Sequence, residues 1–151
     1  MQDIEDFKKS IGKKSRLLGI DPGKKRVGLA ISDEDKLVST PLKTIIKKNN
    51  SDLVKEIKKI IEENNIKGIV VGNPINMDGS KGPSAQSAND FAKYLSNNIS
   101  IPVTMWDERL SSEAAFNLSS NLDINTSKKV EKLDQNAASF ILQGAIDYIR
   151  R

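Results

Sequence analysis

Four acidic residues lie where strands or a helix are expected to begin or end, and their carboxylates could bind metal ions. Asp21 ends the first apolar run of the chain, and Asp107 and Glu108 follow a later one. Asp134 lies in the first turn of the expected final helix. Singly, each position has a structural explanation: a turn residue, an exposed ion pair of little value, or an acid favoured by the helix macrodipole. Three converging carboxylates, however, would repel one another, and two divalent cations between them could support hydrolysis of a phosphodiester.

The residue types that the chain lacks narrow this chemistry. Its 151 residues include no cysteine and no histidine, which excludes thiolate and imidazole catalysis. Carboxylates suit hard cations such as Mg²⁺ or Mn²⁺. The net charge of +4 is compatible with a polyanionic partner without requiring one. No apolar run approaches the roughly 20 residues of a membrane-spanning helix, and the N-terminal residues are polar, so we expect a cytoplasmic protein without a membrane partner.

The hydrophobic pattern predicts one domain at residues 16–151, preceded by a flexible N-terminal arm at residues 1–15. Alternating apolar residues indicate a hairpin that turns at Pro22-Gly23, followed by a third strand. The remaining expected elements are a helix capped by Ser51, a buried strand at 66–72, a helix opened by Pro83, a strand at 101–106 and two helices. This order favours an α/β fold with a central mixed five-stranded sheet, an antiparallel meander followed by parallel strands, flanked by helices.

The last helix carries the clearest apolar stripe. The residues expected on its buried side are Val130, Leu133, Ala137, Phe140, Ile141, Gly144 and Tyr148. Ala137 and Ala138 follow Asp134 by about one turn, and small side chains let a helix approach a sheet closely. We therefore expect this helix to bring Asp134 towards the strand ends.

Four segments together resemble the YqgF family. They read GIDPGKKRVGLAISD, IVVGNP, DERLSS and KLDQNAASFILQG, and the likeness covers residues 16–150 in the family's motif order. These are ribonuclease H-like proteins, similar to the RuvC-type Holliday junction resolvases. The resemblance implies a metal-dependent endonuclease, a hydrolase that matures the 5′ end of pre-16S ribosomal RNA in ribosome biogenesis.

The resemblance also assigns roles to residues. It implies catalytic, metal-binding carboxylates at Asp21, Glu108 and Asp134, with Asp107 as a further ligand, around two Mg²⁺ or Mn²⁺ ions. Gly72 and Pro74 would shape the loop beside the scissile bond. The implied nucleic-acid contacts are Lys24, Lys25, Arg26, Lys81, Arg109, Lys128 and Lys129.

Other functions remain open at this stage. One is resolution of branched DNA, which needs a dimer, whereas the sequence leaves a monomer or a weak dimer equally open. A second is a non-catalytic RNA-binding module, although such a module has no need of carboxylates that repel phosphate. The hairpin also resembles the first phosphate loop of the actin and sugar-kinase superfamily, whose members need a second copy of the domain, for which 151 residues leave no room.

Overall fold

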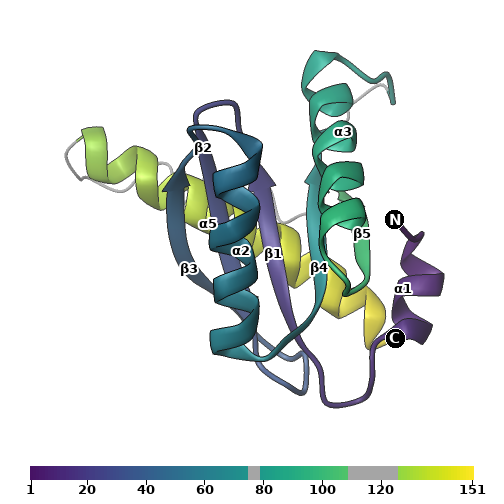
Figure 1. The fold of residues 1–151 in the computed structure, drawn as a ribbon. Coiled ribbons are helices and arrows are strands. Elements are labelled where there is room, and N and C mark those ends of the chain that lie inside the picture. Colours follow the sequence, from purple (N-terminus) through teal and green to yellow (C-terminus); the bar gives the residue numbers. More distant parts are fainter. Residues whose placement is uncertain (75–78, 109–125) are drawn as a thin grey trace.

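A five-stranded mixed sheet forms the centre of the protein (Figure 1). The computed structural model describes residues 1–74, 79–108 and 126–151, and for 126–135 it describes the backbone alone. The strand order is β3-β2-β1-β4-β5, with β1 antiparallel to β2 and parallel to β4. The strands are β1 (Arg16–Pro22), β2 (Arg26–Ser32), β3 (Ser39–Ile46), β4 (Ile66–Asn73) and β5 (Val103–Asp107). The predicted meander followed by parallel strands is confirmed.

Helices cover both faces of this sheet, with α2 and α3 on one face and α5 on the other (Figure 1). The helices in the described residues are α1 (Ile4–Ser10), α2 (Asn50–Asn64), α3 (Pro83–Asn98) and α5 (Thr126–Ile149). Side chains alternate between the two faces along each strand. In β1, Leu18 and Ile20 face α2 and α3, whereas Leu17 faces α5. Both faces of the central strands are therefore buried.

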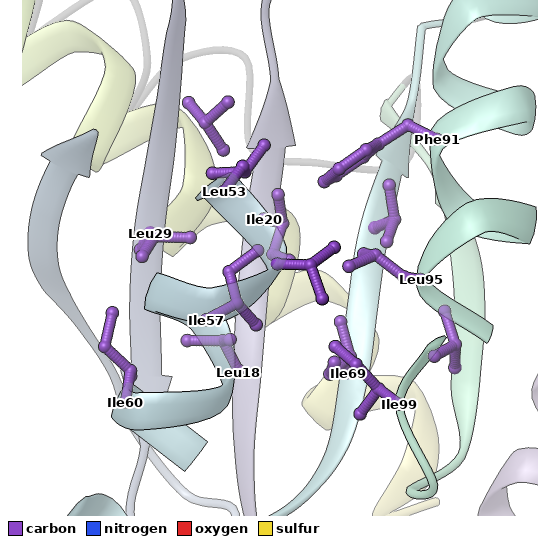
Figure 2. Close-up of a cluster of buried hydrophobic side chains, with 14 of the residues drawn as sticks. Leu18, Ile20, Leu29, Leu53, Ile57, Ile60, Ile69, Phe91, Leu95 and Ile99 are labelled. Atoms are coloured by element: carbon purple, nitrogen blue, oxygen red, sulfur yellow. The ribbon is translucent and has the colours of Figure 1, made fainter. Parts of the chain in front are cut away.

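The larger hydrophobic core lies between the sheet and helices α2 and α3 (Figure 2). Leu53 and Ile57 of α2 and Phe91 and Leu95 of α3 reach into it, and all are at most 6% exposed. The helix α2 begins two residues earlier than a Ser51 cap would allow. Its N-cap is Asn49, whose Oδ1 accepts a hydrogen bond from the Asp52 amide at 2.8 Å, so the predicted Ser51 cap is wrong.

The helix α5 approaches β1 closely because Gly19 has no side chain. A Cβ at Gly19 would lie 2.7 Å from Cβ of Leu142. The buried face of α5 is rotated from the predicted stripe: Ala137, Phe140, Gly144 and Tyr148 are only partly buried. The side chains buried among residues 136–151 are Ala138, Ser139, Ile141, Leu142, Ala145, Ile146 and Ile149, and of these Ile141 alone was in the predicted stripe. Because adjacent apolar residues recur in successive turns of α5, its sequence was compatible with two overlapping apolar stripes.

The N-terminal residues contact the rest of the protein through α1. Phe7 is fully buried in the core on the α5 side, and a Cβ at Gly68 of β4 would lie 2.7 Å from its Cζ. The buried Lys36 ammonium donates to the carbonyl oxygens of Gly12 at 3.1 Å and Lys13 at 2.7 Å. The boundary proposed at residue 15 between an arm and a single domain stays a prediction.

Candidate active site

Asp21 lies near the carboxyl end of β1, on the face that α5 covers. It pairs with Gly28 across the β1–β2 hairpin and is half-buried. Because side chains alternate along a strand, Asp21 shares its face with Leu17 and Gly19. The first predicted carboxylate thus lies at the carboxyl end of the central strand, where the paired neighbouring strands fix the backbone.

Glu108 follows β5 directly, and its side chain reaches that of Asp21. Trp106, two residues earlier, packs in the core on the α5 side, and the Glu108 side chain shares a hydrogen bond with that of Asp21. In the sheet β4 separates β1 from β5, so the two backbones are two strand spacings apart, roughly 10 Å. The Glu108 side chain must therefore extend across β4.

Gly72 of β4 leaves the space for this crossing. Ile20 pairs with Val71 in the β1–β4 ladder, which places Gly72 beside Asp21, and Gly72 pairs with Trp106 on its other side. A Cβ at Gly72 would lie 3.1 Å from Oε1 of Glu108 and 2.6 Å from Cδ1 of Ile141. A side chain there would displace the carboxylate or α5.

The electrostatics of the pair favour a cation. Burial raises the pKa of Glu108, and the negative charge of Asp107 raises it further, whereas the hydrogen bond from Asp21 acts in the opposite direction. Two carboxyl groups can share a hydrogen bond only when one of them is protonated. A divalent cation between them would remove this need, and their oxygens are the ligands that Mg²⁺ and Mn²⁺ prefer.

Asp107 lies beside this pair rather than in it. It ends β5 in register with Asn73 of β4, and alternation directs its side chain to the opposite face from Trp106. Its charge nevertheless acts on Glu108. Oδ1 of Asn73 is buried at the same end of the sheet and has no hydrogen-bond partner among the residues that the structure describes. The geometry therefore favours Glu108 over Asp107 as the partner of Asp21.

The third predicted carboxylate belongs to a part of α5 described only by its backbone. Position 134 lies about one turn before Ala138, whose carbonyl oxygen would be 3.1 Å from a Cβ at Gly19 of β1. The Asp134 side chain lies outside the described residues, as do Arg109 and the side chains of Lys128 and Lys129. Within the described part of the chain, no three acidic side chains form a group that could hold a metal ion.

Three of the predicted nucleic-acid contacts occupy the turn between β1 and β2. Lys24, Lys25 and Arg26 are all exposed there, at the same end of the sheet as Asp21. Gly23 permits the tight turn, because a Cβ on it would lie 2.2 Å from the Arg26 carbonyl oxygen. Lys81 is exposed just before α3, which begins at Pro83.

The sequence interpretation missed two basic residues at this edge. Lys47 and Lys48 follow β3, and the amide of Lys47 donates to the Lys25 carbonyl oxygen at 2.8 Å. The available signal was a basic pair placed directly after a strand that was expected to pair with the hairpin.

The sheet order and strand directions define a ribonuclease H-like fold. A solved structure with the same architecture is Thermus thermophilus RuvC in complex with a Holliday junction substrate, with a TM-score of 0.52 and 11% identity over 89% of this chain and 94% of that one. That likeness concerns the fold alone.

Sequence comparison then gives the family. The profile of the family described as RuvX, Holliday junction resolvase, matches residues 15–148, and the chain belongs to this family. A protein of Pelagibacter ubique named "Putative pre-16S rRNA nuclease" is 58% identical over 149 residues, 99% of each chain. A Rhodobacter capsulatus protein with the same name is 41% identical over 144 residues, 95% of this chain and 91% of that protein.

Proposed function

We propose that this protein is a metal-dependent nuclease that hydrolyses phosphodiester bonds in the precursor of 16S ribosomal RNA and processes its 5′ end. The observation that carries the proposal is the contact between the Asp21 and Glu108 carboxyl groups across Gly72. The names of the full-length relatives support the substrate. Asp134 is proposed as the third catalytic carboxylate and Asp107 as an additional ligand.

The residues of the site would act mainly by holding charge in fixed positions. Asp21 and Glu108 would hold Mg²⁺ or Mn²⁺, in a site that Asp134 completes. The bound cations would activate a water and stabilise the leaving oxygen. Asp21 and Glu108 lie at the ends of buried strands, which fixes their spacing before substrate binds. The exposed cations Lys24, Lys25 and Arg26 would bind phosphates next to the cleaved one.

The proposed substrate also sets the expected cellular location. Among the described residues, no helix combines the length and the apolar character needed to cross a membrane. Precursor ribosomal RNA is a cytoplasmic substrate in a bacterial cell, and we therefore propose a cytoplasmic protein whose partner is nucleic acid.

Resolution of a Holliday junction is the second candidate function, and the description of the family favours it. A symmetric four-way junction needs two active sites held against two strands, so this activity would also require a dimer. A non-catalytic RNA-binding role is the third outcome that an experiment must separate.

A cleavage assay distinguishes these functions. The full chain is incubated with a 5′-extended pre-16S RNA fragment and with a four-way DNA junction, each with Mg²⁺, with Mn²⁺ and with a chelator. We expect metal-dependent cleavage of the RNA at a discrete position. Cleavage of the junction alone would replace the ribonuclease with a resolvase, and tight binding without cleavage of either would favour the binding module.

A further inference from the structure

Lys47 and Lys48 lie at the same end of the sheet as Asp21 but on a segment separate from the β1–β2 turn. Both follow β3 directly, in the connection to α2. Arg26 of β2 pairs with Ile46 of β3, and the Lys47 amide donates to the Lys25 carbonyl oxygen at 2.8 Å. The connection after β3 and the basic turn are therefore direct neighbours.

The side chain of Lys47 is held in place by an aromatic ring from another element. Its Nζ lies 5.8 Å from the ring centroid of Phe91, which belongs to α3. Phe91 is 6% exposed and extends from α3 into the core between the helices and the sheet (Figure 2). A cation over an aromatic face is attracted to it, so the ammonium is directed from the β3 side towards α3.

The charges of Lys47 and Lys48 are available to a ligand. Within the described part of the chain, neither residue forms an ion pair, whereas nearby Lys43 does so with Glu56 at 2.8 Å. Asp52 and Glu56 of α2 line the hollow beside the two lysines, and Glu56 is already engaged by Lys43. The backbone of this connection thus adjoins the β1–β2 turn, and its two cations are not neutralised by an ion pair within the described residues.

We propose that Lys47 and Lys48 each bind a phosphate group of the nucleic-acid strand beyond the cleaved bond, on the β3 side of Asp21. This inference rests on the proposed nuclease function. In the sheet β2 alone separates β3 from β1, so the two strands are about 10 Å apart. A strand that left Asp21 on the α5 face and passed over the end of the sheet would meet the β1–β2 turn first and then Lys47, whose ammonium lies at Phe91 on the α2 and α3 face. The substrate must therefore extend past the cleavage position on this side.

Salt-dependent binding tests the assignment. The parent is Asp21→Asn, which should not cleave, and the probe is the 5′-extended pre-16S RNA fragment in Mg²⁺. Each lost phosphate contact should lower the salt slope by about 0.7 and, at 0.1 M salt, weaken binding about fivefold. We expect the double variant Lys47→Ala, Lys48→Ala to lose about 25-fold and about 1.4 of slope.

Matched variants separate a specific contact from net charge. Lys58→Ala with Lys67→Ala removes the same charge from exposed positions on α2 and at the amino end of β4, and should bind like the parent. Lys47→Arg keeps the cation over the ring and should retain the slope. An unchanged slope in the Lys47, Lys48 double variant, with parental affinity, would overturn the inference alone. Absence of RNA binding by the parent, together with absence of cleavage by the wild type, would overturn the proposed function and this inference with it.

Discussion

At the scale of single residues, Gly72 leaves the space in which the side chains of Asp21 and Glu108 meet. The two carboxylates come from strands that are not neighbours, and the only backbone between them belongs to β4. Ile141 of α5 and Oε1 of Glu108 both occupy the space that a side chain at position 72 would need. The glycine therefore serves the site and the packing of α5 at once.

This double role gives a first prediction. Gly72→Ala should lower the free energy of unfolding by about 1–3 kcal/mol, because the new methyl group overpacks the contact with Ile141. It should also displace Glu108 and reduce cleavage. Chemical denaturation and the RNA cleavage assay measure the two effects. Gly12→Ala is the matched control, since a Cβ there meets only Oγ of Ser15 at 3.5 Å.

Adding Ile141→Val to Gly72→Ala separates the two effects further. The smaller side chain should restore part of the stability and leave cleavage low, because the clash with Glu108 remains. Recovery of cleavage in step with stability would show that Gly72 matters only for packing.

The raised pKa of Glu108 gives a second prediction, on stability in the absence of metal. The folded protein keeps a proton on Glu108 at a pH where the unfolded chain has lost it, so this group lowers stability as pH rises from 4.5 through the raised pKa. Glu108→Gln removes that effect and keeps the shape of the side chain. We expect its free energy of unfolding at pH 7 in chelator to exceed that of the wild type by about 0.5–2 kcal/mol.

The same variant should lose metal-dependent cleavage. The stability difference should shrink as the pH falls below 4.5, where Glu108 is protonated in both states. A thermal unfolding series in chelator checks this sign. Equal stability of variant and wild type across the whole series would show that the carboxylate is not under electrostatic strain.

At the scale of elements, the sequence predicted the strands well, because each combines β-branched residues with a clear end signal. Position 41 in β3 is a proline, yet β3 tolerates it because it is an edge strand with a register irregularity there. The sequence could not settle which of two overlapping apolar stripes α5 buries. That choice depends on how closely α5 approaches Gly19, a tertiary contact.

The position of the candidate site could be predicted to the extent that strand ends identify it. Asp21 and Glu108 follow apolar runs, and their side chains meet in the structure. The catalytic and metal-binding roles that the family resemblance implied for them stay predictions. The proximity of Lys47 to Lys25 could not be read from spacing along the chain, because it depends on the register between β2 and β3. The role of Asp134 stays a prediction.

The helix α1 gives the third prediction. Phe7 is fully buried against Gly68 of β4 although it lies close to the N-terminus. Phe7→Ala should therefore cost about 3–5 kcal/mol in free energy of unfolding, as for other buried phenylalanines. Urea denaturation measures this, with Phe7→Leu as a milder control. A cost below about 1 kcal/mol would mean that the N-terminal residues behave as an independent arm.

At the scale of the whole molecule, acidic and basic side chains occupy different parts of the same end of the sheet. The carboxylates Asp21 and Glu108 lie on the α5 side, where buried strand ends fix their positions. The exposed cations of the β1–β2 turn, the half-buried Lys47 and the exposed Lys48 lie towards the β3 edge. Such an arrangement suits a polyanion that needs both a cation-assisted reaction and phosphate contacts beside it.

The helices on the two faces explain how so small a chain positions this site. Two cores hold the central strands from both sides, so that β1, β4 and β5 present their carboxyl ends as one rigid edge. Residues 109–125, which include Arg109, lie outside the described residues. The contribution of Arg109 to substrate binding stays a prediction.

The most direct test of the central claim is RNA cleavage by Asp21→Asn. The wild type, Asp21→Asn and the control Asp90→Asn, an equal charge change on an exposed residue of α3, are compared on the 5′-extended pre-16S fragment with Mg²⁺ or Mn²⁺. We predict that Asp21→Asn folds normally and loses at least about 100-fold in cleavage rate, since a fixed electrostatic contact to a reaction centre is worth that much. Asp90→Asn should cut like the wild type. Metal-dependent cleavage at the wild-type rate by folded Asp21→Asn would contradict the account.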